Sequence, residues 1–182
     1  MKMIGREKEV KELNKLYDRN RAELVAVYGR RRVGKTYLID ETFAGRITFR
    51  HAGLSPADED AKGLMRAQLD HFYNSLLLFG MEKSKKPDNW LDAFLLLEQF
   101  LQKNDNGSRQ LVFLDELPWL DTPRSGFIRA FEGFWNNWGC HRKNLMVVVC
   151  GSANSWMMNS LINNHGGLYN RVTYEIKLAP FT

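Results

Sequence analysis

Short apolar stretches alternate along the chain with longer segments in which apolar residues recur every three or four positions. The apolar stretches predict buried β-strands near residues 23–28, 110–115 and 145–150, and alternating polar and apolar residues predict two further strands near 47–51 and 173–178. The segments with helical spacing predict helices over residues 6–19, 35–43, 55–79, 89–103, 125–138 and 155–162. Strands that alternate with helices are typical of α/β proteins with a parallel sheet. We therefore expect a three-layer α/β domain with a five-stranded, mainly parallel sheet.

Two of the predicted helices carry features beyond their periodicity. The sequence Ser55-Pro56-Ala57-Asp58 predicts a helix start, with a capping serine, proline at the first position and an acid at the third. The helix over 125–138 carries an aromatic stripe at helical spacing. This spacing favours packing of a single buried face over the alternative, a platform on which nucleic-acid bases stack.

A glycine, four variable residues and then Gly-Lys-Thr occupy residues 29–36, between a predicted strand and a predicted helix. This pattern, in this context, is that of a phosphate-binding loop. Glycines at positions 29 and 34 permit backbone conformations that are closed to residues with a β-carbon. Successive N–H groups can then point at phosphate oxygens. We expect Lys35 to reach the β- and γ-phosphates of a nucleotide and Thr36 to offer its hydroxyl to Mg²⁺.

Two carboxylates, Asp115 and Glu116, lie at the carboxyl-terminal end of the predicted strand 110–115, where open α/β sheets bind their ligands. Asp115 suits a carboxylate that binds Mg²⁺ directly or through its water shell, and Glu116 suits a group that polarises an attacking water. The next strand ends in Gly151-Ser152-Ala153-Asn154. A polar side chain there can contact the γ-phosphate or the water, cap the following helix, or do both.

Composition and charge add little to this picture. Hydrophobic residues make up 44% and charged residues 26% of the 182 residues, as in ordinary soluble domains. The net charge of +5 is compatible with nucleotides or nucleic acid, and equally with a solvated basic surface. Cys140 and Cys150 lack metal-binding or disulfide spacing. His51 stands alone at a strand end, which favours a structural over a catalytic role for it.

No apolar run is long enough to span a membrane, and charged residues follow the first methionines at once, unlike a signal peptide. We therefore expect a cytoplasmic protein without membrane contact.

Together, these motifs resemble those of a known group of proteins. The motif residues are Ile-Gly-Arg-Glu at 4–7, Tyr-Gly-Arg-Arg-Arg-Val-Gly-Lys-Thr at 28–36, Leu-Asp-Glu at 114–116, Cys-Gly-Ser at 150–152 and Tyr-Asn-Arg at 169–171. They are similar to motifs of the archaeal and bacterial P-loop ATPases related to the STAND and Orc/Cdc6-like AAA+ ATPases. The similarity spans essentially the whole chain, and the run 28–36 is its most specific part. The resemblance implies the strand order 5-1-4-3-2.

The resemblance also implies roles for individual residues. Residues 4–7 match a segment that contacts adenine, although Arg6 and Glu7 also suit the simple start of a helix. Ser152 matches a polar sensor of the γ-phosphate, with Asn154 as a second candidate. Arg171 matches an arginine that acts in trans on a neighbour's nucleotide in a homo-oligomer. In the family a glycine precedes this arginine, and here Asn170 replaces it. The alternative is that Arg171 is a plain surface residue. The candidate nucleotide-binding residues are thus Ile4, Gly5, Gly29, Arg30, Arg31, Arg32, Val33, Gly34, Lys35, Thr36 and Tyr37, the metal-binding ones Thr36 and Asp115, and the catalytic ones Lys35, Glu116, Ser152 and Arg171.

We expect residues 1–182 to form one P-loop ATPase domain that binds ATP or ADP with Mg²⁺. Hydrolysis would drive a conformational change in a larger protein. In the family a helical or winged-helix region follows, often with a nuclease-like domain, and this chain stops at residues 179–182, where that region would begin. A DNA or protein partner would bind through that following region. The alternative is a nucleotide-gated switch or DNA-associated scaffold with negligible turnover alone. A small-molecule kinase is the weakest alternative, because the Asp-Glu pair suits water activation better than transfer to a bound acceptor.

Overall fold

A five-stranded sheet, whose three inner strands are buried throughout, forms the centre of the molecule. The computed structural model describes residues 3–152, 154–163 and 165–181, without the side chain of Asn154. Its strands are β1 (Glu23–Gly29), β2 (Phe49–Ala52), β3 (Gln110–Asp115), β4 (Leu145–Gly151) and β5 (Tyr174–Leu178). They form one sheet in the order β2-β3-β4-β1-β5, in which every pairing is parallel. This is the predicted order 5-1-4-3-2 counted from the other edge, so the order is confirmed, and the sheet is wholly rather than mainly parallel.

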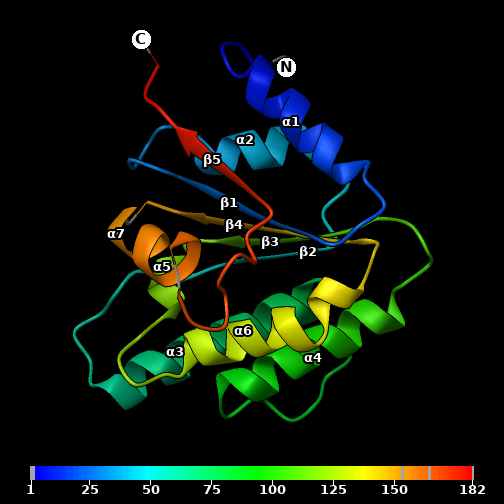
Figure 1. Cartoon of the computed structure of the whole chain (residues 1–182). Coiled ribbons are helices and arrows are strands. Elements are labelled where there is room, and N and C mark those ends of the chain that lie inside the picture. Colours follow the sequence, from blue (N-terminus) through cyan, green and yellow to red (C-terminus); the bar gives the residue numbers. More distant parts are fainter. Residues whose placement is uncertain (1–2, 153, 164, 182) are drawn as a thin grey trace.

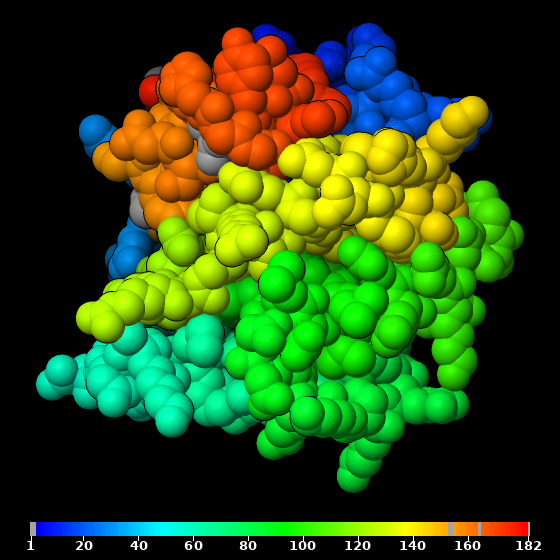
Figure 2. Space-filling view, turned by 60° about the horizontal axis from the view of Figure 1, so that its bottom comes forward, coloured from blue at the N-terminus to red at the C-terminus, as the bar shows by residue number. Residues whose placement is uncertain are grey.

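Helices cover both faces of the sheet (Figure 1). The helices α1 (Glu7–Tyr17) and α2 (Lys35–Thr42) lie on one face, and α3 (Ala61–Leu78), α4 (Trp90–Lys103) and α6 (Phe127–Asn137) lie on the other. Strand β1 serves both cores, because successive side chains of a strand point to opposite faces. Val25 and Val27 pack with α1 and α2, whereas Leu24 and Ala26 pack with the three-helix layer. Figure 2 shows the outer surface of that layer.

Aromatic side chains fill the larger of the two cores. The Phe94 ring of α4 has five aromatic neighbours at centroid distances of 5.1 to 6.0 Å. These neighbours are Phe72, Trp90, Phe127, Phe131 and Phe134, all of them buried. The predicted packing role of the aromatic stripe in α6 is therefore confirmed, and these rings form no open platform for bases.

The predicted helix start at Ser55 is wrong. The helix α3 begins at Ala61, and the Asp60 carboxylate caps it by accepting a hydrogen bond of 2.7 Å from the N–H of Gly63. Before it, the side-chain amide of Gln68 bonds both the N–H and the carbonyl of Leu54, at 3.0 and 2.9 Å. These two bonds tie the backbone of Leu54 to α3 and keep the chain around it out of the helix. A local capping pattern does not reveal a partner thirteen or more residues away.

Two further helical elements differ from the prediction. A short helix, α5 (Leu117–Leu120), follows β3 directly and was not predicted. The predicted helix 155–162 is split into α7 (Asn154–Trp156) and a π-helical turn, Met157–Ile162. Both elements lie at the carboxyl-terminal edge of the sheet (Figure 1). Irregular turns of this kind are common beside functional sites.

Candidate functional site

Residues 29–36 form the loop between the carboxyl-terminal end of β1 and the start of α2. Gly29 has φ +152°, and a β-carbon there would lie 2.5 Å from the carbonyl oxygen of Leu178 in β5. Gly34 has φ +88° and open surroundings. Gly29 is therefore required by a close approach of two strands and Gly34 by its backbone conformation.

The side chains of Lys35, Thr36 and Asp115 meet at this loop. The hydroxyl of Thr36 donates a hydrogen bond of 2.5 Å to Oδ2 of Asp115. The ammonium of Lys35 donates to the carbonyls of Gly29 and Arg30, at 3.0 and 2.7 Å. Burial lowers the pKa of Lys35, and the neighbouring Cys150, Glu116 and Asp115 oppose that shift. The loop thus combines a cation, backbone N–H groups at a helix N-terminus and a paired hydroxyl and carboxylate, which together suit a phosphate with a bound cation.

The donor atoms at the Thr36–Asp115 contact fit Mg²⁺. A hydroxyl and a carboxylate are hard oxygen ligands, of the kind that Mg²⁺ takes together with substrate phosphates. Within the described part of the chain, no group of three or more His, Cys, Asp or Glu is placed to hold a metal. Mg²⁺ bound through few protein ligands, with phosphate and water completing its shell, is the arrangement that these residues support.

Glu116 follows Asp115 in a backbone conformation that is unusual for a residue with a side chain. Its φ is +50°, and its N–H donates a hydrogen bond of 2.9 Å to Oδ1 of Asp115. Burial raises the pKa of Glu116, Asp115 raises it further, and Lys35 and Arg31 oppose the shift. Strained conformations of this kind concentrate at functional sites. A carboxylate with a raised pKa is a better proton acceptor near neutral pH than an ordinary one.

The end of β4 completes this edge of the sheet. Gly151 pairs with Tyr28, the residue before the phosphate loop, so the half-buried Ser152 follows at the level of the loop. Cys150 is fully buried behind the site, and burial raises the pKa of its thiol well above its usual range. The thiol is therefore neutral and acts as a packing group. The side chain of Asn154, the alternative candidate for the sensor, lies outside the described residues.

A hollow of about 260 Å³ adjoins the phosphate loop on the side of the chain's N-terminal segment. Its lining residues are Met3, Ile4, Arg6, Val33, Gly34, Tyr37 and Phe181. The side chains of Ile4, Tyr37 and Phe181 remain largely exposed there. The predicted contacts Ile4 and Tyr37 thus face one apolar hollow beside the loop, and Gly5 lies next to the Phe181 ring.

Arg6 proves to be more than the start of a helix. Its guanidinium donates to the carbonyls of Val33 and Ala179, at 3.2 and 2.6 Å, and lies 4.2 Å from the centroid of the Phe181 ring. It therefore links the phosphate loop to the segment that follows β5. The signal in the sequence was only a charged residue beside a predicted helix, which does not reveal that the residue is buried.

Arg171 lies at the opposite edge of the sheet from the phosphate loop. The N–H of Thr173, two residues later, bonds the carbonyl of Leu24, and β5 pairs with β1 from Val25 onward. These contacts are at the amino-terminal end of β1, whereas the phosphate loop follows its carboxyl-terminal end. The structure does not bring Arg171 to the site of its own chain, and its role in trans stays a prediction.

His51 is a structural residue of the larger core. Its ring is buried, and Nδ1 lies 2.7 Å from the hydroxyl of Ser75. Burial, together with a smaller contribution from the neighbouring His71, lowers its pKa to about 3. The imidazole is therefore neutral at physiological pH, as the structural interpretation of His51 expects.

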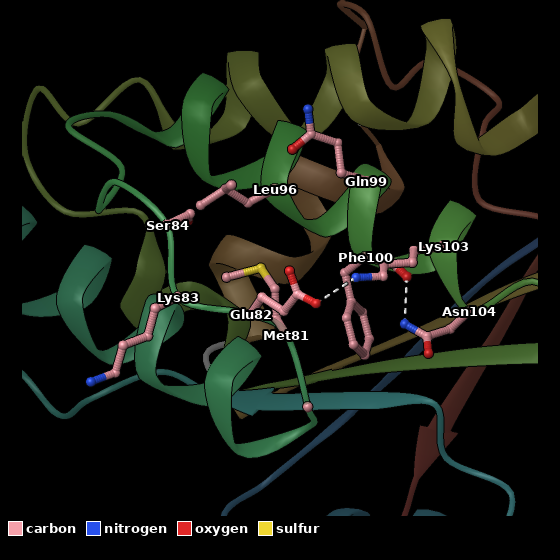
Figure 3. Close-up of a pocket in the computed structure, with 10 residues that line it drawn as sticks. Met81, Glu82, Lys83, Ser84, Leu96, Gln99, Phe100, Lys103 and Asn104 are labelled. Atoms are coloured by element: carbon pink, nitrogen blue, oxygen red, sulfur yellow. Dashed lines mark hydrogen bonds and ion pairs between the residues drawn. The ribbon is translucent and has the colours of Figure 1, made fainter.

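A second hollow lies away from the phosphate loop. It has a volume of about 240 Å³ and lies between residues 80–84 and the last turns of α4 (Figure 3). Glu82 and Lys103 form an ion pair of 3.1 Å across it. The helix α4 ends there, just before the amino-terminal end of β3, so this hollow is not part of the site. None of the helices in the described residues is long and apolar enough to cross a membrane.

Comparison with known proteins agrees with this geometry. Residues 3–182 match a family described as an ATPase domain predominantly from Archaea. The uncharacterized protein MJECL04 of Methanocaldococcus jannaschii is 27% identical over 181 residues, which are 97% of this chain and 36% of that protein. The chain thus spans about a third of that relative's length.

Three solved structures share the fold. The Walker-type ATPase paby2304 of Pyrococcus abyssi has a TM-score of 0.63 and 20% identity, over 98% of this chain and 54% of that one. Cdc6p of Pyrobaculum aerophilum has a TM-score of 0.66 and 16% identity, over 100% and 47%. The ORC2 protein of Aeropyrum pernix, in ADPNP–ADP complexes, has a TM-score of 0.55 and 17% identity, over 97% and 48%. With its phosphate loop and Asp-Glu pair in this shared fold, and with the family match over nearly its full length, the chain belongs to the family of ATPase domains found predominantly in Archaea.

Proposed function

We propose that this ATPase domain binds ATP with Mg²⁺ at residues 29–36 and Asp115, and hydrolyses the γ-phosphate bond. The contact of 2.5 Å between Thr36 and Asp115 carries the proposal. It brings the end of the phosphate loop to the carboxylate pair at the end of β3, although 79 residues separate Thr36 from Asp115 in the sequence. A purely structural glycine loop does not require a threonine hydroxyl and a carboxylate to meet beside a buried lysine.

Each residue of the site has a role in this proposal. Lys35 and the N–H groups of the loop bind the β- and γ-phosphates, and Thr36 and Asp115 hold Mg²⁺, which when bound neutralises charge on the phosphate oxygens. Glu116 orients and polarises the attacking water. Ser152 contacts the γ-phosphate from the end of β4. Positioning and electrostatics supply most of the catalysis in this reaction class.

The hollow beside the loop is where we place the adenine base. Ile4 and Tyr37 supply apolar surface there, and Gly5 brings the N-terminal backbone close. The ADPNP–ADP complexes of the A. pernix ORC2 protein support a nucleotide as ligand of this fold, although its 17% identity shows the fold alone.

We further propose that residues 1–182 are one domain of a larger protein, in which hydrolysis drives a conformational change. The relatives compared here are about two to three times longer. Arg6 joins the phosphate loop to Ala179, so it gives a physical route from the nucleotide to whatever follows β5. A DNA or protein partner would bind through that further region.

A second candidate function is a nucleotide-gated switch with negligible turnover alone. The position of Arg171 favours it, because this arginine lies away from the site of its own chain, so any contribution that it makes to catalysis would need a neighbouring molecule. Turnover by the isolated chain separates the two functions, and turnover that rises steeply with protein concentration would indicate a homo-oligomer with Arg171 acting in trans.

Comparison of wild type with Glu116→Gln tests the proposal. We expect both to bind ATP with similar affinity, and phosphate release to fall at least about 100-fold in the variant. Undiminished phosphate release by Glu116→Gln would remove Glu116 from the mechanism. ATP binding without turnover in wild type would leave the switch as the function of the isolated chain.

A further inference from the structure

One arginine of the phosphate loop lies against an aromatic ring that belongs to another part of the site. The guanidinium carbon of Arg31 is 5.5 Å from the centroid of the Trp119 ring. Arg30, Arg31 and Arg32 are all exposed, so the loop presents three cations to a ligand. A guanidinium stacked on an indole keeps its N–H groups free at its edge for a planar anion.

The backbone of Trp119 has a fixed place because its short helix is wedged between two strand ends. The N–H of Trp119 bonds the carbonyl of Glu116 at 3.0 Å. A β-carbon on Gly53, after β2, would lie 2.7 Å from that carbonyl oxygen and 3.1 Å from Cβ of Trp119. A β-carbon on Gly151, at the end of β4, would lie 2.7 Å from Cδ of Pro118. The helix α5 therefore packs tightly between β2 and β4, and its backbone holds Trp119 one turn after Glu116.

The charge of Arg31 reaches the reactive groups. Arg31 lies in the same loop as Lys35, between the two glycines of the phosphate-binding pattern. Its guanidinium carbon lies 5.5 Å from the centroid of the Trp119 ring, and the backbone of Trp119 is bonded to that of Glu116 at 3.0 Å. The guanidinium therefore lies between the loop that would bind the phosphates and the carboxylate that would face the water. Arg171, the other candidate for such a charge, is at the opposite edge of the sheet.

We propose that Arg31 is a catalytic residue that contacts the γ-phosphate from within the same chain, and that Trp119 is the positioning residue that holds its guanidinium over the site. This inference rests on the proposed function and singles out one of the three arginines. A cation at the γ-phosphate stabilises the charge that develops in the transition state. It also lets the site distinguish a triphosphate from a diphosphate, because a charge-assisted bond to the γ-phosphate exists only with the former.

Affinity for ADPNP and ADP, measured by calorimetry with Mg²⁺, tests Arg31 whether or not the chain turns over alone. We expect Arg31→Ala to weaken ADPNP binding at least about tenfold relative to ADP, which corresponds to the loss of one charge-assisted bond. Arg31→Lys should recover part of that preference. The control Arg129→Ala removes an equal charge from the exposed side of α6, and it should leave the ratio unchanged. An ADPNP-to-ADP ratio in Arg31→Ala equal to that of wild type would overturn the inference.

Trp119 is tested by two substitutions that differ in their ability to stack. Trp119→Ala should lower kcat about tenfold at unchanged KM. If the chain has negligible turnover, the same variant should instead lower the preference for ADPNP over ADP. Trp119→Phe, which keeps an aromatic ring, should restore most of the lost kcat or of the lost preference. Equal losses in both variants would show that the stacking is irrelevant. If wild type binds no nucleotide, the proposed function itself is wrong. If wild type binds nucleotide and Arg31→Ala keeps the same ratio of ADPNP to ADP affinity, only this inference is wrong.

Discussion

The buried guanidinium of Arg6 offers a direct test of how the phosphate loop is held to the rest of the fold. Only 7% of the residue is exposed, and its two carbonyl partners lie on the loop, at Val33, and after β5, at Ala179. Arg6→Ala removes both hydrogen bonds and the contact with the Phe181 ring. Val33 then keeps a buried carbonyl without this partner.

The expected loss in the free energy of unfolding follows from these contacts. A hydrogen bond from a charged donor contributes about 2 kcal/mol, and there are two of them. The stacking on a largely exposed ring contributes about 0.5 kcal/mol. Release of an immobilised arginine side chain returns about 1.5 kcal/mol of conformational entropy. We therefore expect Arg6→Ala to be destabilised by about 3 kcal/mol.

Urea unfolding followed by far-ultraviolet circular dichroism measures this loss. The control is Lys8→Ala, which removes a charge from the exposed side of the same first turn of α1 and should change stability by less than about 0.5 kcal/mol. If Arg6→Ala and Lys8→Ala unfold at the same urea concentration, the two hydrogen bonds from Arg6 to backbone carbonyls do not hold the loop. The proposed link from the nucleotide to the segment after β5 would then be wrong as well.

Two further predictions concern the core and the loop. The pKa of His51 lies at about 3 in the folded chain and near 6.5 in the unfolded one, so between these values the unfolded chain binds more protons and stability falls as the pH falls. Between pH 7.5 and pH 5, the free energy of unfolding should fall by about 2 kcal/mol less in His51→Phe than in wild type. An equal fall in the two proteins would contradict the claim that the buried imidazole of His51 is neutral. Gly29→Ala should destabilise the folded chain by about 3 kcal/mol, because its β-carbon would meet the Leu178 carbonyl. Gly45→Ala, with φ +74° and open surroundings, should destabilise it by only about 1 kcal/mol. Thermal or urea unfolding measures both losses. Similar costs at the two glycines would refute the close approach of β1 and β5.

The features that the sequence predicted well are those that depend on local pattern. The phosphate loop, its flanking strand and helix, and the apolar strand before Asp115 are all contiguous, so their periodicity and glycine positions are visible in the sequence. The strand order came from the resemblance to a family, and the pairing of β1 with β4 and β5 confirms it.

The features that escaped prediction depend on contacts between distant residues. Gln68 determines where α3 can start by binding Leu54, which no capping pattern near Ser55 reveals. The four-residue helix α5 is too short to show a helical period, so Trp119 was not singled out. The burial of Arg6 requires β5 to end beside the phosphate loop, a contact across 173 residues. For Gln68 and Arg6 the deciding contact joins residues that a local sequence pattern does not connect.

The central claim of this account is that residues 29–36 and Asp115 bind ATP, and the most direct test is calorimetric titration of ATP with Mg²⁺ into wild type and Lys35→Ala. We predict that wild type binds and that Lys35→Ala, with an unchanged far-ultraviolet spectrum, binds at least about 100-fold more weakly, since the buried ammonium is the principal cation for the phosphates. Folded wild type that fails to bind ATP, or equal affinity in the two proteins, would contradict the claim.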